Sequence, residues 1–123
     1  MALVNKVILI GNLGKDPELR HTQSGAAVST LSVATTEVRR DEQGVRKDIT
    51  EWHRVIVWNK QAESCAKYLS KGRTVYVEGR LQTRSWEDKN GEKRYATEIV
   101  AQSIVFIGGA KSSQTQQEAP QQE

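Results

Sequence analysis

One short segment of the chain breaks the two-residue alternation that runs through most of the sequence. Within 61–70, Ala62, Cys65, Ala66 and Leu69 recur at i, i+3, i+4 and i+7, the spacing of one face of an amphipathic helix. Three strand-like segments precede this helix and two follow it. The order of elements is therefore the feature that most limits the possible fold.

The strands are indicated by alternating side chains between clear turn signals. The polar loop RRDEQGVRKD separates the second strand from the third, and Asn90-Gly91 is a strong hairpin turn. The predicted strands are Val4–Leu13, Ala27–Val38, Thr50–Trp58, Thr74–Trp86 and Arg94–Ile107. This order predicts an all-β fold with one short helix: a five-stranded OB-fold barrel, with the helix between strands 3 and 4. A five-stranded open sheet is the alternative.

The length and composition predict one domain followed by a tail. A chain of 123 residues can form one compact domain but not two ordinary ones. From Gly108 onward the sequence is rich in Gln, Ser and Ala without apolar periodicity, so it cannot bury enough surface to fold. We predict a domain over residues 1–108 and a disordered polar tail over 109–123.

Charge and cysteine content indicate a mildly basic protein of a reducing compartment. Residues 1–111 contain 18 basic and 13 acidic residues, a net charge of +5, against +3 for the whole chain. That balance favours an anionic partner without identifying it. The single Cys65 cannot form an internal disulfide. The N-terminus resembles no export signal, and no apolar run is long enough to span a membrane, so we expect a cytoplasmic protein.

No arrangement of residues indicates catalysis. Cys65 lies on the apolar stripe of the helix, where a thiol acts as a small hydrophobic group. The GNLG stretch at Gly11–Gly14 lacks the Lys-Ser/Thr pair of a phosphate-binding loop, and the acids show no metal-ligand pattern. We therefore expect no enzyme, no cofactor, no metal and no small-molecule substrate.

The segment EWHRVIVW, residues 51–58, points instead to binding. In a strand, Trp52, Arg54 and Trp58 share one side, while His53 lies on the other. The segment RTRSW repeats the pattern, because Arg84 and Trp86 also share a face. Indoles stack on unpaired bases and guanidinium groups hold phosphates, so the pattern favours single-stranded nucleic acid. The competing interpretation is that Trp52 and Trp58 plug the barrel and Trp86 covers a loop.

Four stretches, VNKVILIGNLGKDPELR, EWHRVIVWNKQAE, YLSKGRTVYVEGRL and TRSWEDKNGEKRY, together closely resemble the bacterial single-stranded DNA-binding proteins of replication, the homotetrameric OB-fold type. The likeness spans residues 4–107. It implies a non-catalytic homotetramer that wraps single-stranded DNA, protecting it during replication, repair and recombination. It also implies a bacterial, cytoplasmic and nucleoid-associated protein.

The resemblance assigns roles to particular residues. His53 and Tyr76 match positions near subunit contacts. The DNA-binding positions that it implies are the aromatic residues Trp52, Trp58 and Trp86 and the basic residues Lys6, Arg20, Arg54, Lys60, Lys71 and Arg84.

The sequence departs from the family pattern at two places. Arg39 stands where many relatives carry a further aromatic residue, so we expect Arg39 to bind DNA through phosphate and make binding more salt-sensitive. The chain stops at EAPQQE without the acidic, hydrophobic-tipped end that docks replication and repair proteins in relatives. We expect such partners only if a longer acidic C-terminus exists.

Other functions stay open from the sequence alone. An OB protein of replication restart or RNA binding would prefer a junction or the ribose hydroxyl. In a different class, the aromatic strands would mediate protein contacts and the basic charge would be incidental. A nuclease would need a metal or nucleophile arrangement that the sequence does not show.

Overall fold

The computed structural model describes residues 2–108 as six strands and one helix. The elements are β1 (Val7–Leu13), β2 (Glu18–His21), β3 (Ala27–Arg40), β4 (Arg46–Trp58), α1 (Asn59–Tyr68), β5 (Thr74–Glu87) and β6 (Lys93–Ile107). All five predicted strands and the helix are present. The predicted tail, residues 109–123, lies outside the described residues.

The five predicted strands form a closed barrel, as the OB-fold prediction requires. Neighbouring strands follow the order β1-β5-β6-β4-β3, and β1 also pairs with β3 through Asn12 and Leu13, which closes the ring. All pairings are antiparallel except that of β4 with β6. Because β1 pairs on both sides, the open-sheet alternative is wrong.

The sixth strand, β2, was not predicted. It pairs with β3 outside the barrel ring, from Glu18 opposite Thr30 to His21 opposite Ala27. All four of its residues are exposed, so its sequence has no apolar alternation to indicate a strand. Its strand conformation depends on the pairing with β3 rather than on a local pattern.

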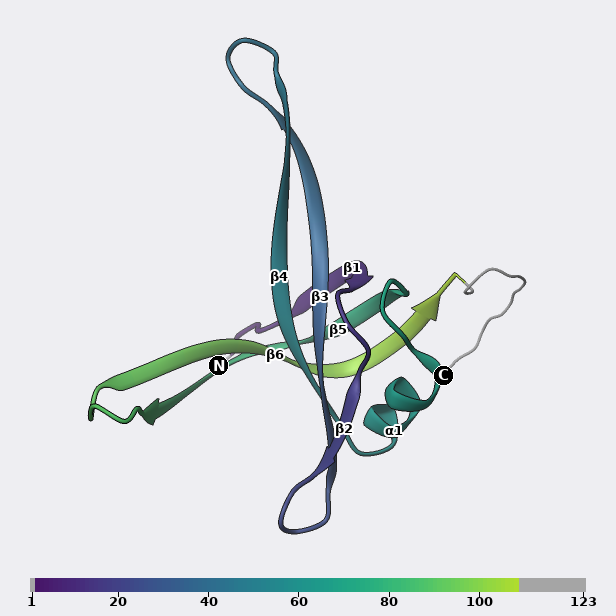
Figure 1. Cartoon of the computed structure of the whole chain (residues 1–123), viewed down its shortest axis with the longest axis vertical. Helices are drawn as coiled ribbons and strands as arrows, with labels where there is room; N and C mark the ends of the chain where they lie inside the picture. Colours follow the sequence, from purple (N-terminus) through teal and green to yellow (C-terminus); the bar gives the residue numbers. More distant parts are fainter. Residues whose placement is uncertain (1, 109–123) are drawn as a thin grey trace.

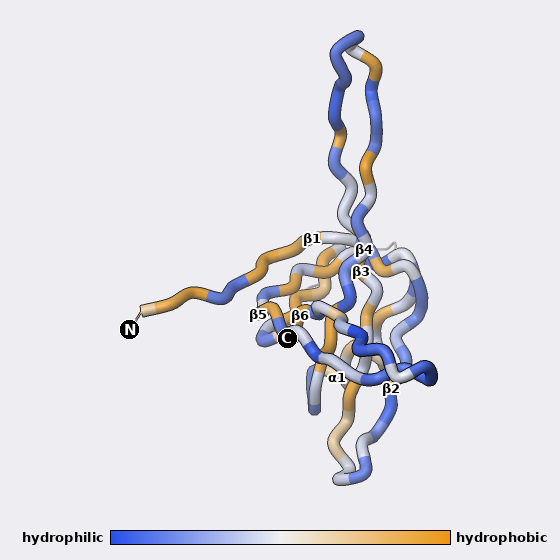
Figure 2. The backbone as a smooth tube through the Cα atoms, turned by 90° about the vertical axis from the view of Figure 1, so that its left-hand side faces the viewer, coloured by the Kyte–Doolittle hydropathy of each residue, from blue (hydrophilic) through white to orange (hydrophobic). Residues whose placement is uncertain are grey.

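Side chains of alternate strand residues point into the barrel and form its core. Val33, Val55, Val57 and Val77 have no exposed surface, and α1 adds the equally buried Cys65 to the same cluster. The helix packs mainly against β3. Figure 1 shows α1 beside the barrel, and Figure 2 shows hydrophobic residues along β1 and in the barrel strands, with hydrophilic residues at the tip of the long arm.

Two glycines allow neighbouring strands of the barrel to come close. A Cβ atom on Gly11 would lie 2.3 Å from the backbone oxygen of Ala34, and one on Gly79 would lie 2.2 Å from that of Val100. Gly79 also lies at a register irregularity between β5 and β6. The first glycine of GNLG thus serves barrel closure.

Several hairpins extend beyond the barrel. β3 and β4 pair as far as Arg40 and Arg46 and form a long arm, the most prominent projection in Figure 1. The hairpin of β5 and β6 pairs as far as Glu87 and Lys93, and Asp88 accepts the backbone N–H groups of Asn90 and Glu92 at its turn. Among the described residues, no helix is long and apolar enough to cross a membrane.

Candidate nucleic-acid interface

The two tryptophans of β4 lie on the outer surface of the barrel. Trp52 is 61% exposed and Trp58 is 39% exposed, whereas Val55 and Val57 between them face the core. At the end of β4, Asn59 adopts a left-handed conformation (φ 63°) and turns the chain into α1 immediately after Trp58. The interpretation that Trp52 and Trp58 plug the barrel is therefore wrong.

The third tryptophan lies on the outer side of the β5–β6 hairpin. Trp86 is 41% exposed, and the guanidinium carbon of Arg84 lies 4.7 Å from the centre of its ring. Arg94 stands opposite Trp86 on β6. A cation over the indole face stabilises the ring's orientation while leaving part of its surface free.

A buried carboxylate on β6 connects the tryptophan-bearing strands β4 and β5. Glu98 is 4% exposed, and its Oε2 atom accepts hydrogen bonds from Nε of Arg54 (2.6 Å) and from Nε of Arg84 (3.1 Å). Since β6 lies between β4 and β5, the arginine of each tryptophan-bearing strand bonds to the same oxygen atom. Sequence reasoning missed Glu98, because a lone acid in a strand gives no signal of the partners that fold over it.

A second missed residue lies beneath Trp52. A Cβ atom built on Gly14 would stand 2.4 Å and 2.6 Å from two ring carbons of Trp52. The backbone N–H of Gly14 donates to the carbonyl oxygen of Ser32 on β3, at 2.9 Å, which holds the glycine in place. The last glycine of GNLG thus leaves room for the ring of the exposed Trp52 to pack against the backbone.

The basic residues predicted for DNA binding divide between several places. Arg20 donates from β2 to the Thr30 hydroxyl (3.2 Å), and its cross-strand row continues through Val28 to Trp58. Lys60 is exposed in the first turn of α1, two residues after Trp58, and Lys71 is exposed after the helix. Arg20 and Lys60 are therefore close in register or sequence to Trp58.

Arg39 lies on the projecting arm, where its guanidinium pairs with Glu37 at 3.3 Å. Ala34 faces Trp52 across the strands, and alternation from that pair puts Arg40 and its partner Arg46 on the tryptophan side. Arg39 and its partner, Lys47, occupy the other side of the arm.

Lys6 lies away from the tryptophans. Its ammonium group forms an ion pair with Glu78, which also accepts a hydrogen bond from the hydroxyl of Tyr76 at 3.0 Å. The hydrogen bond from Lys6 and then that from Tyr76 hold the pKa of Glu78 below its usual range, and the same contact with Glu78 raises the pKa of Lys6. The predicted DNA residue Lys6 thus shares its surroundings with the predicted interface residue Tyr76.

His53 lies off the tryptophan side, as alternation predicts. Its Nε2 atom is 2.8 Å from the hydroxyl oxygen of Thr35, and the pair is partly buried. The roles of His53 and Tyr76 at subunit contacts, like the DNA contacts above, stay predictions.

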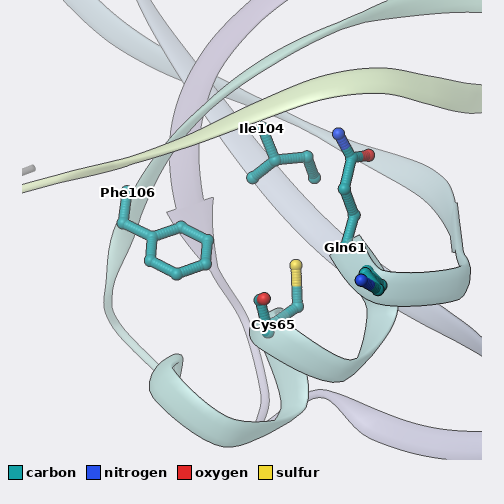
Figure 3. Close-up of a pocket in the computed structure, with 6 residues that line it drawn as sticks. Gln61, Cys65, Ile104 and Phe106 are labelled. Carbon is teal, nitrogen blue, oxygen red and sulfur yellow. The ribbon is translucent and has the colours of Figure 1, made fainter. Parts of the chain in front are cut away.

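A separate pocket of about 210 Å³ lies between α1 and the end of β6. Figure 3 shows the Cys65 side chain pointing from α1 toward Ile104 and Phe106. Burial raises the pKa of the Cys65 thiol to about 12, so it stays protonated near neutral pH and is a poor nucleophile. Within residues 2–108, no group of three or more His, Cys, Asp or Glu residues could hold a metal ion.

A closed five-stranded barrel with exposed indoles and guanidinium groups on one side defines a nucleic-acid-binding barrel of the single-strand type. The model of the Single-strand binding protein family matches residues 4–107. Single-stranded DNA-binding protein 1 of Chlorobaculum tepidum is 53% identical over 110 residues, which cover 89% of this chain and 68% of that protein.

Two solved structures support the same assignment. The Plasmodium falciparum SSB in complex with ssDNA superposes with a TM-score of 0.80 at 36% identity, over 88% of this chain and 98% of that one. A deletion mutant of the single-stranded DNA binding protein from Thermus aquaticus gives a TM-score of 0.77 at 36% identity, over 87% and 52%. The chain therefore belongs to the single-strand binding protein family, and it binds single-stranded DNA.

The contact between Gly14 and Trp52 gives a first testable prediction. Gly14→Ala should displace the Trp52 ring and weaken binding of oligo-dT by about 1 kcal/mol, the lower end of the value of one base–indole stack. Titration followed by tryptophan fluorescence measures the loss. In a Trp52→Ala background, Gly14→Ala should have almost no further effect; an undiminished effect would show that Gly14 does not act through Trp52.

Proposed function

We propose that the protein binds single-stranded DNA without regard to base sequence, by stacking bases on Trp52, Trp58 and Trp86. Basic side chains hold the phosphates; those proposed are Arg54, Arg84, Arg20, Arg39, Lys60, Lys71 and Lys6. The observations that carry this proposal are that all three indoles are exposed, that Arg84 lies over the ring of Trp86, and that Arg54 shares the outer side of β4 with Trp52 and Trp58. Support for Lys6 is weakest, because Glu78 already neutralises it.

The chemistry of the surface favours single strands over duplex. Bases offer their faces to an indole only when they are unpaired, and every base has such a face. Stacking therefore selects unpaired nucleic acid while remaining indifferent to sequence. Guanidinium and ammonium groups add affinity that does not depend on the bases.

We further propose that the protein protects and organises single strands during replication, repair and recombination. As in the family it resembles, it would act without catalysis, in the cytoplasm of a bacterium and in association with the nucleoid. Replication and repair proteins would be partners only through a longer acidic C-terminus.

Intrinsic tryptophan fluorescence tests the stacking proposal. Titration with oligo-dT should quench the emission strongly and saturably, at low and high salt, whereas duplex of the same length should not. Replacing Trp52, Trp58 and Trp86 one at a time by Phe measures how much of the quenching comes from each tryptophan. Absence of quenching in a folded protein would favour protein contacts as the role of the indoles, and stronger competition by oligo-U than by oligo-dT would indicate an RNA-binding protein.

The arm between β3 and β4 gives a prediction about salt. If Arg39 contacts a phosphate, Arg39→Ala should flatten the slope of log K against log salt by about 0.7, the value for one single-strand contact. Arg40→Ala is the matched control, because Arg40 lies on the tryptophan side of the arm. A change with Arg40→Ala alone would remove Arg39 from the site and place the DNA path on the tryptophan side.

We also propose that four copies assemble into a homotetramer and that the outer face of β1 and β5 takes part. Ile8 and Ile10 are 57% and 58% exposed there, and they stand opposite Glu78 and Tyr76. The row from Ile10 through Tyr76 continues to Val105 on β6, which is 40% exposed. An exposed apolar patch of this kind is typical of a protein–protein contact, and a second copy of the chain is the occupant that the family resemblance indicates.

The pair between Lys6 and Glu78 on this face should add folding stability that depends on pH. The pKa of Glu78 is lowered, so its carboxylate stabilises the pairing with Lys6 fully above the ordinary value of about 4.3, and the effect is lost as pH falls through the lowered value. In urea unfolding, wild type and a variant without this carboxylate should differ most in free energy of unfolding from neutral pH to about pH 5, and the difference should shrink as pH falls below about pH 4.

Glu78→Gln provides the control for this prediction. Asp88, whose pKa is lowered mainly by its hydrogen bond from Arg94, titrates in both proteins, so the difference between wild type and variant isolates Glu78. An identical pH profile of unfolding for Glu78→Gln would show that the network does not contribute to folding stability.

A further inference from the structure

Glu98 is the one charged residue among 2–108 that is buried. It lies on the outer side of β6, in the middle of a surface that attracts an anion. A buried carboxylate is stable only with close partners, and here two guanidinium groups cover it. By repulsion alone, a negative charge at this place would weaken the binding of a phosphate. Its presence here therefore suggests a second effect, on the two arginines.

The contacts of Glu98 leave the terminal guanidinium nitrogens of both arginines without a partner among residues 2–108. Arg54 and Arg84 each donate only Nε to Oε2 of Glu98, and no other acceptor within residues 2–108 bonds their terminal nitrogens. The two side chains are 50% and 46% exposed. Each guanidinium therefore keeps its outer N–H groups available to solvent or to a ligand.

The remaining freedom of these groups is small. A planar guanidinium fixed at Nε can turn only with its long side chain, and that of Arg84 also lies over the ring of Trp86 at 4.7 Å. Paired terminal N–H groups match the oxygen atoms of a phosphate in geometry and charge. Holding them in place before the ligand arrives removes part of the entropy that binding would otherwise lose.

We infer that Glu98 is a positioning residue, which aims the terminal nitrogens of Arg54 and Arg84 at a phosphate of single-stranded DNA that passes between the tryptophans of β4 and Trp86. This inference rests on the proposed DNA path and adds a residue to it. Glu98 itself touches no DNA. Its effect is carried by the two arginines.

The alternative is that Glu98 only neutralises charge. The two possibilities predict opposite changes in DNA affinity when the charge of Glu98 is removed. Glu98→Gln keeps the shape and an acceptor oxygen but removes the negative charge. If Glu98 only neutralises, this variant binds oligo-dT more tightly. If Glu98 positions the arginines, binding weakens by about tenfold, the size of one charge-assisted hydrogen bond, although the protein becomes more positive.

Glu51→Gln is the matched control for charge. Glu51 adjoins Trp52 in sequence, is exposed, and forms no ion pair within residues 2–108. Its replacement makes the same change in net charge on the strand that carries Arg54, but on the His53 side of that strand, and binding should be unchanged or slightly tighter. Equal or tighter binding by Glu98→Gln than by Glu51→Gln would overturn the inference.

Two further measurements separate positioning from a structural role. In an Arg54→Ala/Arg84→Ala background, Glu98→Gln should change affinity less than twofold, because the groups it positions are gone. In free wild-type protein, NMR should show slowly exchanging Nε–H signals for Arg54 and Arg84. Rapidly exchanging signals, or a full Glu98→Gln effect without the arginines, would refute the inference, and the NMR result holds even if Glu98→Gln fails to fold.

Failure of the inference and failure of the proposed function remain distinct. Tight binding by wild type with tryptophan quenching, together with an unaffected Glu98→Gln variant, removes Glu98 alone. Saturable binding without quenching leaves the arginine arrangement in place and refutes the stacking path. Absence of binding by wild type refutes both.

Discussion

Closure of the barrel is the constraint on which the rest of the structure depends. Because β1 pairs with both β3 and β5, the strands enclose a single interior, and each has one side within it. Branched aliphatic residues such as Val33, Val55 and Val77 lie in that space and have no exposed surface. The large and charged residues that alternate with them are thereby placed outside. The same closure that builds the core thus builds the proposed binding surface.

The surface also depends on which strands closure makes neighbours. Arg54 and Arg84 lie far apart in the sequence, but β6 runs between their strands and presents Glu98 to both. Gly14 reaches Trp52 in the same way, through the pairing of β1 and β3 near Leu13. The site is therefore made of cross-strand contacts, and each strand alone carries only a part of it.

This division explains what could be predicted from the sequence. The alternation of 51–58 and 84–86 is local, so it predicted the outward direction of Trp52 and Trp86, and the helix was predicted from its own period. β2 was missed because all its residues are exposed. The arm of β3 and β4 is longer than predicted, because its outer residues are mostly exposed on both sides and show no apolar alternation. Glu98 and Gly14 contact residues on other strands, which no local pattern indicates.

The cations of the surface differ in how firmly they are held. On the arm, the exposed pair between Arg39 and Glu37 is of a kind that contributes little and exchanges readily with another anion. Beside the barrel, the pairs with Glu98 share a buried oxygen atom and are less screened by salt. On the proposed path, the barrel would fix the position of the strand between the indoles, whereas the arm would adapt to it. Rigid and adaptable contacts together suit a ligand whose backbone is regular in charge but variable in shape.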